Sequence, residues 1–145
     1  MEFQIRLAVQ SDMELLLRLD PLAQVESSRR AQIEHAVLKK ECWLASGYGG
    51  PRVSLGYGCL EKSFFGEWFI PLVVVSAAHR RMGVATRIIS HLEHCASAEK
   101  IFTSTNSSNL PMQRLLERSG YNPSGVIENL DPGDPELVFV KTFKR

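Results

Sequence analysis

The stretch of residues 69–92 constrains the fold most strongly, because it changes from a strand-like to a helix-like pattern within a few residues. Residues 70–75 form an apolar, β-branched run that is long enough for one buried strand. A short turn of small residues follows, and then the basic, glycine-containing segment 79–85. From Val84 onward, apolar residues recur at helical spacing. The stretch therefore predicts a strand, a turn and the start of a helix.

This predicted geometry has a chemical consequence at the start of the helix. The first N–H groups of a helix have no acceptor within the helix. The helix dipole and the neighbouring side chains of Arg80 and Arg81 would attract a phosphate group to that point. The sequence therefore predicts an anion site where the helix begins.

Composition limits the class of protein. The 145 residues are 44% hydrophobic and 23% charged, which is typical of one soluble globular domain. The net charge of +1 gives no basic field that would indicate nucleic acid as a partner. No apolar run approaches the roughly 20 residues that a membrane span needs, and the N-terminus lacks the apolar core of a signal peptide.

The cysteines indicate a reducing setting. Cys42, Cys59 and Cys95 form no CxxC pair, and an odd number cannot all pair within the chain. We therefore expect a cytoplasmic protein.

The first part of the chain alternates one strand with two helices. Residues 3–7 alternate between apolar and polar side chains, which predicts a half-buried strand. Ser11 or Asp12 is expected to cap a helix that ends at Asp20-Pro21. A second helix is expected from Ser27 or Ser28 to Lys40. Its apolar side is expected to carry Ile33, Ala36, Val37 and, less clearly, Leu38. The residues between these helices, 24–26, either line a substrate cleft or form a surface loop.

The middle of the chain predicts strands and hairpins. Strands are expected at residues 42–46 and 53–59, joined through the turn cluster 47–51. Gly56 and Gly58 share one strand face, which indicates either close approach of another backbone or a locally weak strand. Pro71 has no N–H to donate and predicts an edge, a bulge or a break in strand pairing.

The last part of the chain completes an α/β pattern. Residues 100–105 predict a strand that runs parallel to the strand at 70–75, because a helix connects them. A polar run ending at Asn109 is expected to cap a helix at 110–118, and strands at 121–128 and 136–143 form an antiparallel hairpin. The expected fold is a mixed sheet of about seven strands with about four helices.

The motif at residues 80–85, Arg-Arg-Met-Gly-Val-Ala, resembles the R/Q-x-x-G-x-G/A signature of the GNAT superfamily of N-acetyltransferases. Val73 and Val75 precede it where that family places its cofactor-binding strand. The order of elements is similar over nearly the whole chain. The resemblance implies a single GNAT-like acetyltransferase domain over residues 1–145.

The resemblance also implies acetyl-CoA as the donor substrate. Main-chain groups of the strand would pair with its pantetheine arm, and N–H groups at the helix start would hold its pyrophosphate. A small residue at 83 and 85 keeps that backbone accessible. Asn109 matches the asparagine at a helix start that commonly contacts the cofactor, and it is also a good N-cap. The cofactor-binding residues implied in this way are Val73, Val74, Val75, Arg80, Arg81, Met82, Gly83, Val84, Ala85, Thr86 and Asn109.

One position departs from the family pattern. A tyrosine often stands near the end of the helix that precedes the place of Gly120, where it can protonate the departing thiolate. This sequence has Leu116 there, so that general acid is missing.

Acetyl transfer to an amine needs a base, a donor to the thioester oxygen and, for some enzymes, an acid. A backbone N–H such as that of Val75 would suit the thioester oxygen. Glu67 is the first choice for the base, because it lies on the strand that leads to the donor site, although a solvated carboxylate at a strand start is an equal interpretation. The remaining candidates are Glu136 and Asp134 as carboxylates, His79 as a base, and Tyr121 and Ser107 as proton donors. His91 and His94 share a helix face without a third metal ligand, so no metal site is expected.

The expected function is transfer of an acetyl group from acetyl-CoA to a primary amine of a small-molecule or protein acceptor. The alternatives are a non-catalytic acyl-CoA sensor or regulatory module, which Leu116 would support, and an interaction domain without a cofactor. A homodimer, common in the family, is compatible with either cofactor-binding function.

Overall fold

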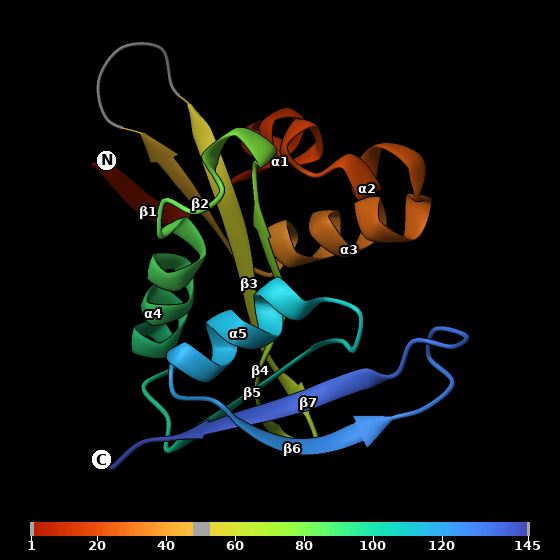
Figure 1. Cartoon of the computed structure of the whole chain (residues 1–145). Helices are drawn as coiled ribbons and strands as arrows, with labels where there is room; N and C mark the ends of the chain where they lie inside the picture. Colours follow the sequence, from red (N-terminus) through yellow and green to blue (C-terminus); the bar gives the residue numbers. More distant parts are fainter. Residues whose placement is uncertain (1, 48–52, 145) are drawn as a thin grey trace. The chain divides into compact units, whose positions relative to one another are not determined.

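The computed structural model describes residues 2–47 and 53–144 and shows an α/β fold of seven strands and five α-helices in these ranges (Figure 1). The hydrogen-bonded strand order is β1-β2-β3-β4-β5-β7-β6, with both antiparallel and parallel pairs. The elements, including two 3₁₀ turns, are β1 (Phe3–Leu7), η1 (Gln10–Asp12), α1 (Met13–Leu19), α2 (Pro21–Val25), α3 (Ser27–Leu38), β2 (Cys42–Gly47), β3 (Ser54–Phe64), β4 (Glu67–Val75), η2 (Ala77–His79), α4 (Val84–Ala96), β5 (Lys100–Asn106), α5 (Leu110–Arg118), β6 (Asn122–Ile127) and β7 (Glu136–Thr142). The predicted mixed sheet is confirmed, and α2 is the helix that the sequence did not predict.

The chain divides into two compact units. The first consists of Met1–Leu60 and Leu72–Leu92, and the second of Glu61–Pro71 and Glu93–Arg145. Strands β3 and β4 and helix α4 each contribute residues to both units. The single domain predicted for residues 1–145 stays a prediction.

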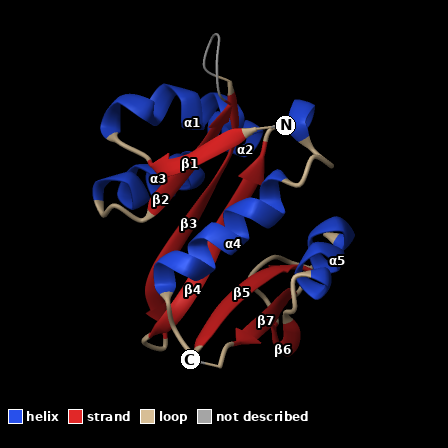
Figure 2. Cartoon of the chain, turned by 90° about the vertical axis from the view of Figure 1, so that its left-hand side faces the viewer, coloured by secondary structure: helices blue, strands red, loops and turns tan. Residues whose placement is uncertain are grey.

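The first unit packs helices on both faces of antiparallel strands. On one face, Leu44 and Tyr57 join an apolar core with Leu16 and Ile33 of the helices α1 and α3. The opposite face lies against α4 (Figure 2). A Cβ at Gly58 would lie 2.4 Å from Ile88 Cγ2 of that helix, so only glycine fits there.

The surroundings of Gly56 decide between the two interpretations of this strand, close approach of another backbone and a locally weak strand. A Cβ at Gly56 would lie 2.7 Å from the carbonyl oxygen of Val74 and 3.3 Å from Cα of Val75. Another backbone therefore approaches this strand closely, and the interpretation as a locally weak strand is wrong. Because Gly56 has no side chain, β3 can pack closely against the backbone at Val74 and Val75.

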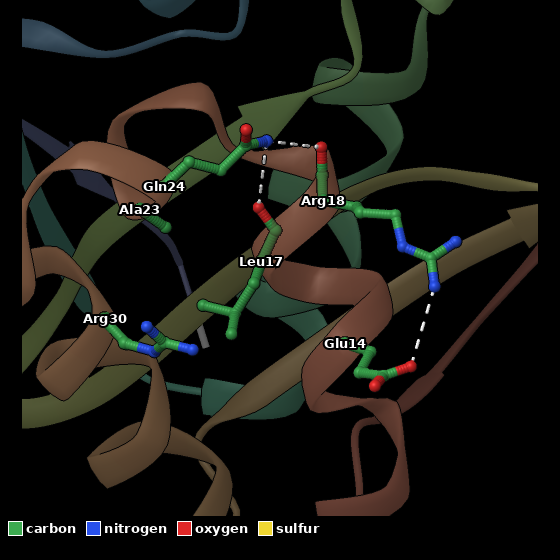
Figure 3. A pocket seen from close by; sticks show the side chains of 6 residues that line it. All are labelled: Glu14, Leu17, Arg18, Ala23, Gln24 and Arg30. Carbon is green, nitrogen blue, oxygen red and sulfur yellow. Dashed lines mark hydrogen bonds and ion pairs between the residues drawn. The ribbon is translucent and has the colours of Figure 1, made fainter.

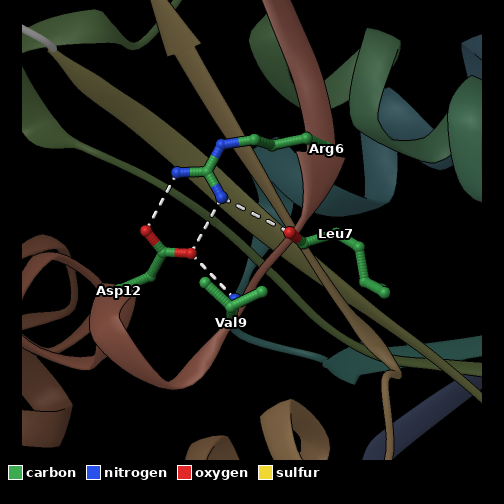
Figure 4. Close-up of polar contacts among 4 residues, drawn as sticks. All are labelled: Arg6, Leu7, Val9 and Asp12. Atoms are coloured by element: carbon green, nitrogen blue, oxygen red, sulfur yellow. Dashed lines mark hydrogen bonds and ion pairs between the residues drawn. The ribbon is translucent and has the colours of Figure 1, made fainter.

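An ion pair fixes the entry into α1 (Figure 4). Arg6 donates from Nη1 and Nη2 to the two carboxylate oxygens of Asp12, at 2.8 and 2.9 Å. The same carboxylate accepts the N–H of Val9 at 2.8 Å. Asp12 is the N-cap residue of α1, as predicted, but its carboxylate binds back across the preceding turn η1 and accepts no capping hydrogen bond from α1.

The connection after α1 is more ordered than the sequence indicated. Asp20 ends α1 and also caps α2, because its Oδ1 accepts the N–H of Leu22 at 3.1 Å. Pro21 stands in the first turn of α2, where its missing N–H costs nothing. Of the two interpretations of residues 24–26, the surface loop is wrong, since Gln24 and Val25 belong to α2 and Glu26 is the N-cap of α3.

Helix α3 agrees with the sequence except at Leu38, whereas β3 runs to Phe64, beyond the predicted strand end at residue 59. Ile33, Ala36 and Val37 are buried as predicted, but Leu38 is 74% exposed and does not belong to the apolar side. Strands β2 and β3 pair antiparallel, as expected for a hairpin. Of the predicted turn 47–51, all but Gly47 lies outside the described residues.

The second unit is built on β5. Strand β5 pairs parallel with β4 through Phe69↔Phe102 and Ile70↔Thr103, which confirms the predicted crossover. Among the described residues, the parallel ladder consists of these two pairs and ends just before Pro71 of β4. The end of the ladder at Pro71 agrees with the predicted break in strand pairing. On its other side β5 pairs antiparallel with β7, and β6 is the edge strand.

None of the helices in the described part of the chain combines the length and the apolar character that crossing a membrane requires.

Candidate functional site

The predicted anion site is a sharply turned segment in front of α4. Two residues adopt positive φ angles, Arg81 at 64° and Gly83 at 78°, and α4 begins directly afterwards at Val84. Such angles strain a residue with a side chain, and glycine adopts them without cost. The chain therefore turns sharply just before the first residue of α4.

The N–H groups at this start have room for a ligand. The first helical hydrogen bond runs from the N–H of Arg87 to the carbonyl of Gly83, at 3.1 Å. The N–H groups of residues 84–86 precede it and have no acceptor within the helix. A Cβ at Gly83 would meet nothing within 4 Å, so open space lies beside this backbone. Backbone donors, a helix dipole and open space together fit a phosphate group.

Packing holds this helix start in place. Val84, Ile88 and Leu92 are at most 1% exposed and form the buried side of α4. On the strand side, the N–H of Ser76 donates to the carbonyl of Leu55 at 2.9 Å. The backbone groups of the turn are therefore held between two fixed elements, which lowers the entropy that binding a ligand would cost.

The side chains of the predicted cofactor set differ in exposure. Arg80, Arg81, Met82 and Thr86 are exposed, and Ala85 is half-buried. The three valines 73–75 at the end of β4 are also half-buried. His79 is half-buried as well, and its Nδ1 lies 2.7 Å from the hydroxyl of Ser76. The two exposed guanidinium groups can thus approach an anion near the turn.

Asn109 begins α5 in the second unit. Its Oδ1 accepts the N–H of Met112 at 3.2 Å, so the predicted N-cap is confirmed. The residue is exposed to solvent. Leu116, in the same helix, is 1% exposed and purely apolar, so it contributes to the core rather than to proton transfer.

Glu67 stands at the first residue of β4 and forms an ion pair. Its Oε1 lies 3.6 Å from Nζ of Lys100, and both side chains are partly exposed. This placement leaves Glu67 able to act as a base and also explains it as a surface ion pair.

Tyr121 is buried in a polar cluster that the sequence did not reveal. Its hydroxyl donates to Glu93 Oε2 at 2.8 Å, and Lys141 Nζ lies 3.2 Å from both oxygens of that carboxylate. Burial, together with the charge and hydrogen bond of Glu93, raises the pKa of Tyr121 far above its ordinary value. The phenol therefore keeps its proton, which is donated in the hydrogen bond to Glu93. The three residues lie 20 or more positions apart in the sequence, so local patterns gave no signal.

The carboxylates of the last hairpin serve the turn. Asp134 accepts hydrogen bonds from the hydroxyl groups of Ser107 and Ser108, at 3.0 and 2.6 Å. These bonds, that of Ser108 first, lower the pKa of Asp134. Glu136 accepts a hydrogen bond from the hydroxyl of Ser104 at 2.7 Å. The hairpin is thereby tied to the segment before α5.

A second buried polar cluster lies in the first unit. The carboxylate of Asp20 accepts from the hydroxyl of Tyr57 at 2.7 Å and from Nη1 of Arg29 at 2.8 Å. Burial alone would raise the pKa of Asp20, but the hydrogen bonds from Tyr57 and Arg29 and the charge of Arg29 outweigh it and lower the pKa. The cluster ties β3 to the corner between α1 and α2. Tyr57 lies 37 positions from Asp20, so no local sequence pattern indicates the cluster.

A hollow of about 350 Å³ lies among the three N-terminal helices (Figure 3). It is lined by Glu14, Leu17, Arg18, Ala23, Gln24 and Arg30. Gln24 Nε2 donates to the carbonyl groups of Leu17 and Arg18, at 3.4 and 3.3 Å (Figure 3). Both guanidinium groups are paired with carboxylates: Arg18 lies 3.6 Å from Glu14, and Arg30 lies 4.0 Å from Glu34.

No group of three or more His, Cys, Asp or Glu side chains within residues 2–47 and 53–144 is arranged to hold a metal ion.

Comparison with known proteins identifies the family. The model of the acetyltransferase (GNAT) family matches residues 14–121, which include the turn before α4 and Asn109. The chain belongs to the GNAT acetyltransferase family. A GNAT acetyltransferase from Bacillus cereus is 30% identical, covers 99% of this chain and 99% of its own, and has a TM-score of 0.87. The predicted GNAT-like fold is thereby confirmed.

Two more distant structures share the GNAT fold. The structure of yncA from Salmonella typhimurium with its cofactor acetyl-CoA is 17% identical, covers 99% of this chain and 95% of its own, and has a TM-score of 0.74. The ribosomal-protein-S18-alanine N-acetyltransferase of Escherichia coli is 12% identical, covers 99% and 96%, and has a TM-score of 0.82. None of the curated proteins matches the chain.

Proposed function

We propose that this protein transfers the acetyl group of acetyl-CoA to a primary amine of a small-molecule or protein acceptor. The observation that supports this most directly is the turn at Arg81 and Gly83, which opens the N-terminus of α4 to a phosphate group. Membership of the GNAT family supports acetyl-CoA as the donor, and the Salmonella relative holds that molecule. The thioester of acetyl-CoA supplies the activated acetyl group.

The donor is assigned to residues of the turn and the preceding strand. The N–H groups of residues 81–86 bind the pyrophosphate, and Arg80 and Arg81 add charge-assisted contacts. The main-chain groups of residues 73–75 pair with the pantetheine arm, and the N–H of Val75 donates to the thioester oxygen. Asn109 is proposed as a further contact. The cytoplasmic location and the homodimer stay predictions.

Release of free thiol from acetyl-CoA tests the activity. We expect the purified protein to release CoA in the presence of at least one member of a panel of primary amines and peptides, and Gly83→Glu to abolish the release. If the protein binds CoA but releases none across the panel, the non-catalytic sensor takes the place of the enzyme. The buried Leu116, in the position of the family's tyrosine, is the observation that favours this alternative.

For proton removal from the acceptor we propose Glu67, because it is the carboxylate on β4, the strand that leads to the donor site. Tyr121 is the second candidate for proton transfer. Its hydroxyl is buried and donates a hydrogen bond to Glu93, which favours a structural role for this residue.

Replacement of Glu67 by glutamine tests the base. We expect kcat/KM of Glu67→Gln to fall by about 100-fold and the acidic limb of the pH profile to disappear. Glu61→Gln, a change at another carboxylate of the same hairpin, should leave the profile unchanged. A Glu67→Gln enzyme whose rate equals that of the wild type at every pH would rule out the proposed role.

A further inference from the structure

Cys42 and Cys59 face each other across neighbouring strands. They are direct partners in the antiparallel register of β2 and β3, and both are buried thiols. Both belong to the apolar core that packs against α1–α3, so their side chains share one face of the sheet. No local sequence pattern indicates this pairing, because the two cysteines belong to different strands.

The hydrogen bonds around the pair decide how close the two backbones come. The carbonyl of Cys42 accepts the N–H of Ala8 at 2.8 Å, so it points towards β1 and away from β3. The adjacent N–H of Leu60 donates to the carbonyl of Glu41 at 2.9 Å, so the bonded pair lies one residue further on. Bonded and non-bonded pairs alternate in an antiparallel ladder. Cys42 and Cys59 therefore form a non-hydrogen-bonded pair.

This position matches the geometry of a disulfide. In a non-hydrogen-bonded pair the Cα atoms are about 4.5 Å apart and the side chains are at their closest. Disulfides span Cα distances of about 4.4–6.8 Å, so the pair can be bridged with little backbone movement. We propose that Cys42 and Cys59 are a redox-responsive pair that closes a cross-strand disulfide when the protein meets a peroxide.

The reaction balances with hydrogen peroxide as the oxidant. One cysteine sulfur attacks a peroxide oxygen, the O–O bond breaks, and a sulfenic acid and a water molecule result. The second sulfur attacks the sulfenic sulfur, the S–S bond forms, and the S–OH oxygen leaves as a second water molecule. Together the two thiols lose two electrons and two protons, and the peroxide is reduced.

Burial selects the oxidant and the product. Cys42 is 0% and Cys59 is 2% exposed, so a small peroxide can reach them through local opening, but the thiol of another protein cannot. Cys95 is exposed, so both a peroxide and the thiol of another protein can reach it. Cys95 therefore provides a matched control within the same chain.

Peptide mapping of the full-length protein tests the proposal. The reduced protein is treated with hydrogen peroxide, denatured in an alkylating agent, and digested. We expect a peptide pair joined through Cys42 and Cys59, a mass loss of about 2 Da for the two hydrogen atoms, and reversal by dithiothreitol. Cys95→Ala should give the same joined peptides, whereas Cys42→Ala and Cys59→Ala should not.

The oxidised Cys95→Ala protein should also unfold at a higher temperature than its reduced form, because the bond closes a loop in the unfolded chain. The wild-type and Cys95→Ala maps decide the matter even if the core variants fail to fold. Cys42 and Cys59 that stay alkylatable, or that become sulfinic acids without a crosslink, would overturn the proposal. So would a lower unfolding temperature of the crosslinked form, since it would show that the native spacing does not accommodate the bond.

Discussion

Asp20 shows how one buried carboxylate can organise a corner of the fold. It receives the hydroxyl of Tyr57, a guanidinium N–H of Arg29 and the N–H of Leu22, and it is 3% exposed. Without it the buried hydroxyl of Tyr57 would lose its acceptor, and the partly buried guanidinium of Arg29 would lose its counter-charge. A buried charge pair that loses one partner costs far more than the pair itself contributes. Asp20 is therefore expected to be among the most sensitive polar positions of the first unit.

The lowered pKa of Asp20 gives this residue a pH signature. Because the folded-state pKa lies below the unfolded one, the stabilisation is complete above about pH 4 and is lost as the pH falls through the folded-state value. Asp20→Asn should lower the free energy of unfolding at pH 7 by about 3 kcal/mol, and the difference from the wild type should narrow below pH 4.

Urea unfolding at several pH values measures this difference. Tyr57→Phe keeps the carboxylate and removes one hydrogen bond, so it should cost about 1–2 kcal/mol at pH 7. Glu14→Gln, which removes an exposed carboxylate, should change neither stability nor its pH dependence by a measurable amount. An Asp20→Asn deficit that stays constant from pH 7 to pH 3 would contradict the account.

At the scale of elements, the side chain of Asn109 at the start of α5 has two roles that can be tested separately. Asn109 caps the helix, and we propose that it also contacts the donor. Asn109→Ala should lower the free energy of unfolding by about 1 kcal/mol and also weaken CoA binding. Asn109→Ser keeps a capping oxygen but loses the amide group.

We therefore expect Asn109→Ser to retain wild-type stability and still bind CoA more weakly. Thermal unfolding and calorimetric titration with CoA provide the two readouts. Wild-type affinity in both variants would reduce Asn109 to a helix cap.

The elements also show which features the sequence could predict. The strand, turn and helix around Gly83 were predictable because apolar periodicity and a glycine act over neighbouring residues. Helix α2 was missed because its five residues are too few to show a period, and because Pro21 ends one helix and also starts the next.

The polar clusters were missed for a different physical reason. Tyr121 lies 28 positions from Glu93, and Tyr57 lies 37 positions from Asp20. Only the fold brings such partners together. Glu67 was visible as a carboxylate on a strand, but its pairing with Lys100 was not.

At the scale of the whole molecule, the family model spans residues of both compact units, and β3, β4 and α4 run through both. The donor assignment, however, depends on a few backbone groups in the first unit. Substitution of Gly83 is the most direct way to test this assignment. Its φ angle of 78° needs glycine, and the space beside it is open.

The chain contains a matched position that separates strain from binding. Gly66, in the turn between β3 and β4, has a φ angle of 79°, and a Cβ added there would likewise meet nothing within 4 Å. A glutamate at either position should cost about 1–2 kcal/mol of backbone strain. Only at residue 83 would it also place a negatively charged side chain in the space proposed for the phosphate.

Calorimetric titration of CoA into Gly83→Glu and Gly66→Glu is therefore the most direct test of the proposed donor site. We expect Gly66→Glu to bind CoA with the affinity of the wild type, and Gly83→Glu, equally folded by circular dichroism, to show no binding heat. Wild-type affinity in Gly83→Glu, or an equal loss in both variants, would contradict the assignment of the pyrophosphate to the N-terminus of α4.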